Sequence, residues 1–103
     1  MSREFADRDL ESTVEDEVCA WAENNGWLVR KMGYTGRRGC PDRFLFGYGR
    51  IMMIEFKRPN GKLSANQRRE HRRMRDAGLE VRVVEYAEDG IDILRSAIRE
   101  PRG

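Results

Sequence analysis

A continuous apolar run, Ile51–Phe56 (IMMIEF), constrains the fold more than any other segment of the chain. A strand with one face in water alternates apolar and polar residues, whereas this run is apolar almost throughout. The run therefore predicts a central strand in a sheet that is covered on both faces. Its single acid, Glu55, lies between Ile54 and Phe56. Burying a carboxylate at such a position is costly unless the carboxylate binds something.

The size of the chain predicts one domain. The chain has 103 residues, of which 39% are hydrophobic, and its formal net charge is +2. A chain of this length builds one modest core, so we expect a single domain over residues 1–103, with residues 1–10 and 100–103 flexible. No run approaches the ~18 apolar residues of a membrane helix, and the acidic first segment lacks the pattern of a signal peptide. We therefore expect a cytoplasmic protein that does not bind a membrane.

The other segments alternate between helical and strand patterns. Apolar residues at helical spacing, bounded by capping and stop residues, predict helices over residues 12–25, 65–77 and 91–98. The expected N-caps are Ser12 or Thr13 for the first helix and Ser64 for the second. Shorter runs predict strands over residues 27–32, 42–46, 50–57 and 79–86, with a tight hairpin turn at residues 47–49. The order α-β-β-β-α-β-α predicts an α/β protein built around a mixed central sheet.

The small net charge conceals a strong asymmetry along the chain. Residues 1–29 carry two Arg against eight acids, and residues 76–103 carry four Arg against seven acids. Residues 30–75 carry fourteen Lys plus Arg against three acids, a sum of +11. Seventeen of the twenty basic residues are Arg, whose guanidinium holds phosphate oxygens through two hydrogen bonds in a fixed fork. The central segment therefore predicts a polyanionic partner.

Two acids and a lysine are spaced for chemistry on phosphate. If residues 42–46 and 50–57 form a hairpin, Asp42 and Glu55 converge at one end of the sheet. Carboxylate oxygens are the ligands that Mg²⁺ and Mn²⁺ prefer, and the backbone carbonyl of Phe56 is a candidate to complete the metal shell. Because side chains alternate along a strand, Lys57 shares a face with Glu55, where it would orient or help to deprotonate an attacking water. This spacing serves phosphodiester hydrolysis.

Three motifs in order resemble the PD-(D/E)xK nuclease superfamily, and most closely its VRR-NUC family. They are Gly39–Asp42 (GCPD), Glu55–Lys57 (EFK) and Leu63–Gln67 (LSANQ). The resemblance extends from about Glu11 to the end of the last expected strand, and the three elements stand at family-like spacing. It implies a restriction-endonuclease-like core.

The resemblance also implies roles for four residues. Asp42 and Glu55 correspond to metal ligands, Lys57 to the catalytic lysine, and Gln67 to an additional active-site residue at the start of the basic helix. Each has a structural alternative. Asp42 after a proline fits a turn, Glu55 with Lys57 fits an exposed cross-strand pair, and Gln67 fits a polar residue that only begins a helix.

Nucleases of this kind also take an acid for the metal region from their first helix. We assign Glu15, since it lies on the same helix face as Val18 and Ala22 and can point inward. Glu11, one turn earlier, is the alternative. Glu15 is equally compatible with a surface acid that complements the helix dipole. The lone His71 fits a packed or hydrogen-bonded helix residue better than a ligand, and both tryptophans fit the core better than a platform for bases.

The basic residues divide by their expected positions. A glycine-bounded loop before Asp42 holds two arginines, and a lysine precedes the basic helix, so both groups border the proposed metal site. On the helix, Arg68, Arg72 and Arg75 share one side while Arg69 and Arg73 share another. We expect one of these sets near nucleic acid and the other solvated or paired with acids. The candidates for contacts with the DNA backbone are Arg37, Arg38, Lys62, Arg68 and Arg72.

These observations predict a Mg²⁺- or Mn²⁺-dependent DNA endonuclease. One site cuts one strand, so cutting a duplex needs two copies, and we expect a homodimer. The resemblance implies structure-selective cleavage of branched DNA such as four-way (Holliday) junctions, and a role in DNA replication or repair in a bacterial or phage-infected cell. Two alternatives stay open: a non-catalytic nucleic-acid-binding module on the same fold, and an RNA endonuclease.

Overall fold

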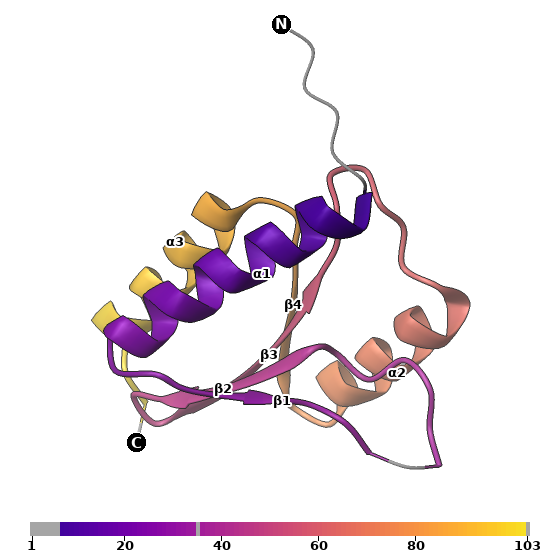
Figure 1. The fold of residues 1–103 in the computed structure, drawn as a ribbon. Coiled ribbons are helices and arrows are strands. Elements are labelled where there is room, and N and C mark those ends of the chain that lie inside the picture. Colours follow the sequence, from indigo (N-terminus) through magenta and orange to yellow (C-terminus); the bar gives the residue numbers. More distant parts are fainter. Residues whose placement is uncertain (1–6, 35, 103) are drawn as a thin grey trace, which may run out of the picture.

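A computed structural model describes residues 7–34 and 36–102, in which three helices pack on a four-stranded sheet (Figure 1). The helices are α1 (Asp7–Asn24), α2 (Ala65–Asp76) and α3 (Ala87–Arg99). The strands are β1 (Leu28–Lys31), β2 (Arg43–Gly47), β3 (Arg50–Phe56) and β4 (Glu80–Val84). The predicted α/β class and the order α-β-β-β-α-β-α are confirmed. Among the described residues no helix has the length and apolar character that crossing a bilayer requires.

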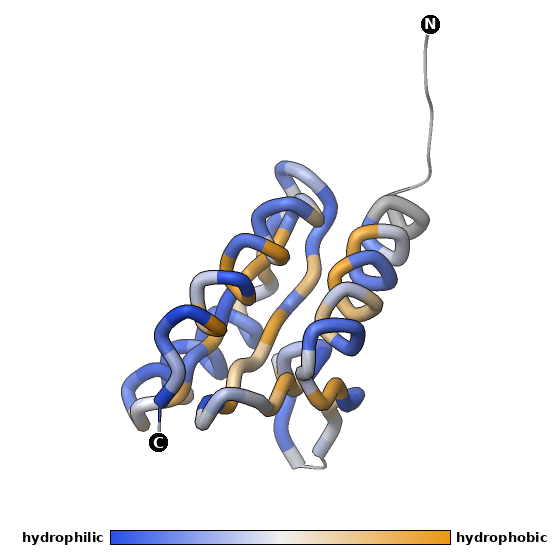
Figure 2. The backbone as a smooth tube through the Cα atoms, turned by 90° about the vertical axis from the view of Figure 1, so that its left-hand side faces the viewer, coloured by the Kyte–Doolittle hydropathy of each residue, from blue (hydrophilic) through white to orange (hydrophobic). Residues whose placement is uncertain are grey.

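The sheet has the order β1-β2-β3-β4 and is mixed, as expected. The first three strands are antiparallel neighbours, whereas β4 runs parallel to β3 because α2 connects them. Helices α1 and α3 cover one face of the sheet and α2 lies on the other (Figure 1). Figure 2, seen from the side of α1 and α3, shows these two helices running next to each other over the strands.

Strand β3 is buried on both faces over most of its length. Its residues from Met52 to Phe56 are at most 3% exposed, which confirms the central strand that the apolar run predicts. Alternate side chains serve two clusters. The larger lies under α1 and α3 and contains Val18, Cys19, Ala22, Trp27, Val29, Leu45, Met52, Ile54, Phe56, Val84, Leu94 and Ala97. The smaller lies under α2 and contains Met53, Met74 and Val81. Ile51, beyond the reach of α2, is 51% exposed.

Helix α1 begins earlier than predicted. It begins at Asp7, five residues before the expected position 12, and Ser12 and Thr13 are exposed residues inside it rather than caps. Serine and threonine lower helix propensity only slightly, so a cap-like sequence is tolerated in a helix interior. Residues 7–10, which belong to the segment expected to be flexible, are helical. The same expectation for residues 1–6 and 103 falls outside the described residues.

Helix α3 also begins before its predicted start. It begins at Ala87 instead of Ile91 and continues through Gly90, which is buried. A Cβ at Gly90 would lie 2.9 Å from Cγ2 of Val18, so the glycine allows α3 to approach α1 closely. Sequence reasoning treats a glycine as a helix boundary, and here close packing outweighs that preference.

The hairpin between β2 and β3 is confirmed. Its two turn residues, Tyr48 and Gly49, both have positive φ, 56° and 71°, as a type I′ turn requires. The Tyr48 hydroxyl donates a hydrogen bond to the carbonyl of Asn25, and its ring centroid lies 5.1 Å from that of Trp27. Trp27 is a core residue, 3% exposed, while Trp21 packs at the edge of the core beneath the guanidinium of Arg95.

Candidate active site

Asp42 and Glu55 meet at the end of the sheet where β2 begins and β3 ends. The antiparallel register pairs Arg43 with Ile54, which places the preceding Asp42 beside the last residues of β3. The backbone N–H of Asp42 donates to the carbonyl of Ile54 at 3.0 Å. Its side-chain Oδ2 accepts a hydrogen bond from the backbone N–H of Phe56 at 2.7 Å. Asp42 is thus held on the sheet through both its backbone and its side chain.

The carboxylate of Glu55 is buried and only half satisfied. The residue is 3% exposed, and its Oε2 accepts a hydrogen bond from Nε2 of Gln67 at 2.9 Å. The same oxygen lies 3.6 Å from Nζ of Lys57. Among the described residues Oε1 has no hydrogen-bond partner. Since buried polar atoms are normally paired, an orphaned carboxylate oxygen indicates a site for a ligand.

Both carboxylates have raised pKa values in the free protein. Burial first, and then the charge of Asp42, raise the pKa of Glu55 to about 7, with Lys57 opposing the shift. The pKa of Asp42 is also raised, first by burial, although the hydrogen bond from Phe56 works against this. One lysine therefore faces a buried acid, Glu55, and a half-buried one, Asp42, and a bound cation would relieve the remaining repulsion.

Gln67 links helix α2 to Glu55. In the first turn of α2, the backbone N–H of Gln67 donates to Oγ of Ser64 at 3.0 Å, and its Oε1 accepts from the Ser64 N–H at 2.9 Å. These two bonds form a capping box, while Nε2 of the same side chain reaches Glu55. The Gln67 side chain therefore makes both contacts. It begins the helix and also holds Glu55, so the two interpretations of this residue do not exclude each other.

The two candidate acids of α1 lie near Asp42 in different surroundings. Glu15 accepts a hydrogen bond from Nε of Arg43 at 2.6 Å, and its charge raises the pKa of Asp42. Glu11 accepts from the backbone N–H of Arg58 at 3.3 Å, and its charge raises the pKa of both Asp42 and Glu55. Sequence reasoning missed Arg43. Its only sequence signal is its place after Asp42, which directs it toward the face covered by α1.

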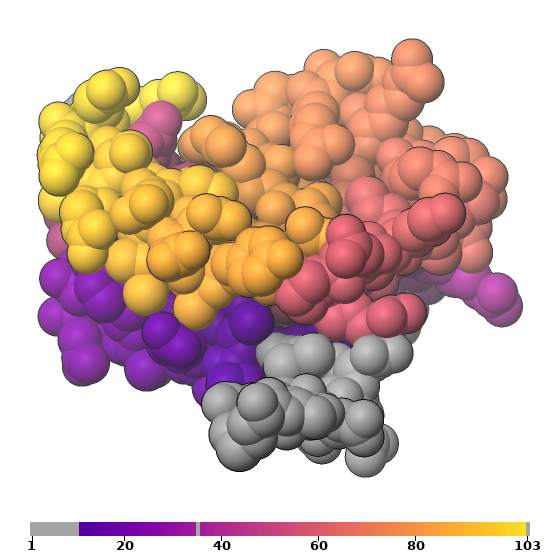
Figure 3. Space-filling view, turned by 90° about the horizontal axis from the view of Figure 1, so that it is seen from above, coloured from indigo at the N-terminus to yellow at the C-terminus, as the bar shows by residue number. Residues whose placement is uncertain are grey.

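A cavity of about 370 Å³ joins these residues. Its walls come from α1, the ends of β2 and β3, and the start of α2, and the lining residues are Glu11, Ser12, Glu15, Asp42, Glu55, Phe56, Lys57 and Gln67. Figure 3 looks onto this end of the molecule and shows α3 beside α1, with α2 and the segment before it forming the right-hand part of the view.

The donor set of the cavity fits a hard divalent cation. Within residues 7–34 and 36–102 no group of three or more His, Cys, Asp and Glu side chains is arranged to hold a metal ion. Mg²⁺, however, usually keeps several waters and takes one or two carboxylates from the protein and the rest from substrate phosphate. Asp42 and Glu55 match that pattern, and the unpartnered Oε1 of Glu55 is an available ligand atom.

The predicted DNA-binding residues are exposed. Arg37 and Arg38 lie in the loop before Asp42, Lys62 lies before α2, and Arg72 lies on α2. Arg68 is also exposed and donates to the carbonyl of Leu63 at 2.8 Å. The other helix set is engaged within α2, where Arg69 bonds Asn66 at 2.8 Å and Arg73 bonds Glu70 at 3.4 Å.

His71 is packed rather than hydrogen-bonded. It is fully buried, and neither ring nitrogen has a hydrogen-bond partner in the described part of the chain. Its pKa is lowered, first by burial and then by the charge of Arg75. Of the two predicted alternatives, a packed or a hydrogen-bonded helix residue, the structure has the packed one.

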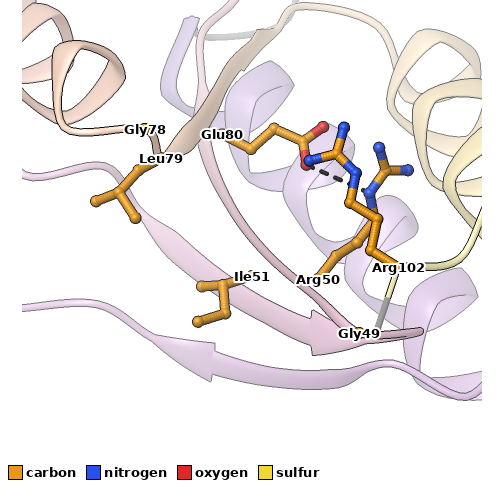
Figure 4. A pocket seen from close by; sticks show the side chains of 7 residues that line it. All are labelled: Gly49, Arg50, Ile51, Gly78, Leu79, Glu80 and Arg102. Carbon is orange, nitrogen blue, oxygen red and sulfur yellow. Dashed lines mark ion pairs between the residues drawn. The ribbon is translucent and has the colours of Figure 1, made fainter.

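A second hollow lies at the opposite end of the sheet, where β3 and β4 begin (Figure 4). It measures about 270 Å³ and is lined by Gly49, Arg50, Ile51, Gly78, Leu79, Glu80 and Arg102. Its carboxylate, on Glu80, lies 3.5 Å from Nε of Arg50. This hollow has no second acid, so it lacks the paired carboxylates of the first cavity.

Comparison with known proteins agrees with the motifs. Residues 10–87 match the VRR-NUC domain family. The chain is 33% identical over 76 residues to a protein of Acyrthosiphon pisum secondary endosymbiont phage 1 called "Putative nuclease p44", a match that covers 73% of this chain and 82% of the relative. It is also similar to a solved structure described as a VRR_NUC domain, with a TM-score of 0.76 and 34% identity over 84% of this chain and 95% of that one.

Proposed function

The chain belongs to the VRR-NUC family of PD-(D/E)xK nucleases, and we propose that it is a Mg²⁺- or Mn²⁺-dependent endonuclease that cuts branched DNA such as four-way (Holliday) junctions. One observation carries the proposal. The carboxylate of Glu55 is buried with Oε2 held by Gln67 and with Oε1 unpartnered in the described chain, next to a second acid and a lysine. A buried charge in this state is destabilising without a ligand.

The residues of the cavity have distinct roles in this proposal. Asp42 and Glu55 hold the divalent ion, with the backbone carbonyl of Phe56 as a further ligand. When bound, the ion supplies a Lewis acid for the phosphodiester. Glu15 is the acid from α1, and Glu11 is the alternative. A comparison of Glu15→Gln with Glu11→Gln decides between them, since the larger loss of cleavage identifies the acid that acts on the site.

Lys57 and Gln67 act on the water and on Glu55. Lys57, whose Nζ lies 3.6 Å from Oε2 of Glu55, orients the attacking water and offsets the negative charge that builds on the phosphate in the transition state. Gln67 fixes Oε2 of Glu55 and so leaves Oε1 to the ion. Holding the reacting groups in place beforehand accounts for much of the rate of such an enzyme.

The charge of the exposed residues and the one proposed site per copy support the proposed substrate and assembly. The exposed Arg37, Arg38, Lys62, Arg68 and Arg72 hold backbone phosphates, which makes binding dependent on salt. One copy cuts one strand, so cleavage of a junction requires a homodimer. Light scattering at the concentrations used for cleavage tests this, and a monomer that cuts both strands there contradicts it.

The decisive experiment compares substrates, metals and variants. Labelled four-way junction, flap, linear duplex and single-stranded RNA are incubated with Mg²⁺, Mn²⁺ or a chelator. We expect the junction to be cut by the wild type with either metal and by neither Asp42→Asn nor the chelated enzyme. The control, Asp89→Asn, makes the same chemical change at an exposed residue of α3 and should cut like the wild type.

Each alternative has its own outcome in that experiment. Binding of the junction without cleavage under any condition identifies a non-catalytic binding module. Cleavage confined to RNA identifies an RNA endonuclease. Cleavage that Asp42→Asn leaves unchanged shows that the paired acids are not the catalytic site.

A further inference from the structure

The loop between β1 and β2 is attached to helix α2 by one long-range hydrogen bond. The hydroxyl of Tyr34 donates to Oε2 of Glu70, 36 residues further along the chain. Glu70 is only 8% exposed, although it belongs to a strongly basic helix whose arginines face water. Its other oxygen lies 3.4 Å from Nη1 of Arg73. The loop therefore covers this side of α2.

A second contact lies one turn earlier on the same helix. Gly39, near the end of the loop, has a φ of +90°, and a Cβ there would lie 2.3 Å from the carbonyl oxygen of Asn66. Only glycine permits both this backbone conformation and this approach. The loop thus touches α2 at residues 66 and 70, on either side of Gln67.

Ahead of the packed His71 and Met74, polar contacts attach the first six residues of α2, residues 65–70. The buried residues of the helix are Glu70, His71 and Met74, and the apolar cluster with the sheet is built on Met74, toward its end. Ahead of that cluster, Gln67 is bonded to Glu55 inside the active site, and Glu70 is bonded to Tyr34 outside it. A segment with few buried apolar contacts moves easily, so each polar contact has a large share in holding it.

We propose that Tyr34 and Glu70 are positioning residues for cleavage, because their hydrogen bond holds the first two turns of α2 and thereby keeps Gln67 on Glu55. The proposal rests on the proposed function for the roles of Gln67 and Glu55. The charges near the pair support it. The hydrogen bond lowers the pKa of Glu70, while burial and this carboxylate raise the pKa of Tyr34, so the phenol remains the donor at neutral pH.

Tyr48 offers a matched control. Tyr34→Phe and Tyr48→Phe each remove one phenol hydroxyl that makes one hydrogen bond, but the bond of Tyr48 goes to Asn25 at the far end of the sheet. We expect Tyr34→Phe to speed amide hydrogen exchange over residues 65–71 and to lower kcat about tenfold with KM within about twofold. Tyr48→Phe should leave exchange over residues 65–71 and cleavage at wild-type values.

Two further comparisons separate positioning from general destabilisation. If Tyr34 acts through Gln67, the double variant Tyr34→Phe/Gln67→Ala should cleave no more slowly than Gln67→Ala alone. Glu70→Gln keeps an acceptor for the phenol, so it should cleave faster than Glu70→Ala. Rates that multiply in the double variant, or equal rates for the two Glu70 variants, overturn the proposal.

The exchange measurement keeps the two proposals distinguishable. If the wild type cuts no substrate with any metal, the proposed function fails, and unchanged exchange over residues 65–71 in Tyr34→Phe then refutes the attachment of α2 independently. If the wild type cuts and Tyr34→Phe behaves like Tyr48→Phe in both measurements, the nuclease assignment stands and the positioning role is wrong.

Discussion

Gln67 donates a hydrogen bond from Nε2 to Oε2 of Glu55 at 2.9 Å while its own Oε1 accepts one from the backbone of Ser64. One side chain therefore stabilises the start of α2 and holds the buried acid of the candidate active site. The two tasks are separable by mutation, because the contact with Ser64 that orients Gln67 uses the Ser64 backbone and not its hydroxyl.

The first prediction compares the two residues of the capping box. Ser64→Ala loses the side-chain cap and should cost about 1 kcal/mol of unfolding free energy, yet its backbone N–H still orients Gln67, so cleavage should stay within about twofold. Gln67→Ala should lose a similar stability and also at least about tenfold in cleavage rate. Urea unfolding and single-turnover cleavage measure both quantities, and equal cleavage by the two variants would refute the link to Glu55.

The second prediction concerns the cost of the buried acid. Glu55→Gln should unfold at a higher urea concentration than the wild type at pH 8 in a chelator, since the neutral amide avoids burying a charge. Mg²⁺ should raise the Tm of the wild type and leave that of Glu55→Gln unchanged, because a ligand stabilises only the state that binds it. An equal rise in both proteins would place the ion elsewhere.

The third prediction is a pH dependence from His71. Burial and the charges of Arg75 and Lys57 lower its pKa, and Glu70 opposes them. As the pH falls, the unfolded chain therefore takes up a proton near pH 6.5, and the folded chain does so only at a lower pH. The contribution of neutral His71 to the free energy of unfolding is therefore complete above pH 6.5 and is lost as the pH falls below that value. His71→Leu should lose less unfolding free energy between pH 7.5 and pH 5 than the wild type, and equal losses would exclude His71 as the cause.

The fourth prediction compares two glycines of one loop. Gly36 and Gly39 have similar φ values, 83° and 90°, but a Cβ at Gly36 has nothing within 4 Å whereas one at Gly39 meets Asn66. Gly36→Ala should cost about 1 kcal/mol from backbone strain alone. Gly39→Ala should cost clearly more and slow cleavage, because the loop must leave α2. Equal stability of the two variants in urea unfolding contradicts the close approach.

The fifth prediction separates phosphate contacts from general charge. Arg37→Ala and Arg72→Ala should each reduce the slope of log Kd against log salt by about 1, the effect of losing one phosphate contact. The control, Arg99→Ala, removes the same charge from α3, on the other face of the sheet, and should leave the slope unchanged. Fluorescence anisotropy with a four-way junction measures it, and a uniform effect of all three would indicate only net charge.

Local patterns were sufficient for much of the fold. The order of helices and strands, the tight hairpin and the Ser64 cap all depend on residues close together in the sequence, and the structure has each of them. The predicted starts of α1 and α3 were wrong, because a cap-like sequence is tolerated inside α1 and because packing sets the start of α3. Gly90 continues a helix only because its missing side chain allows α3 to approach Val18, and that contact lies 72 residues away in the chain.

The sequence by itself determined which residues of the sheet converge. A two-residue turn sets the register of β2 against β3, and that register brings Asp42, Glu55 and Lys57 to one end. Only the tertiary structure decided how deeply Glu55 is buried, that Gln67 holds one of its oxygens, and that Tyr34 is bonded to Glu70. The physical reason is that strand alternation and turn geometry act between near neighbours. The placement of a helix across a sheet depends instead on the packing of segments far apart in the chain, for which no sequence period exists.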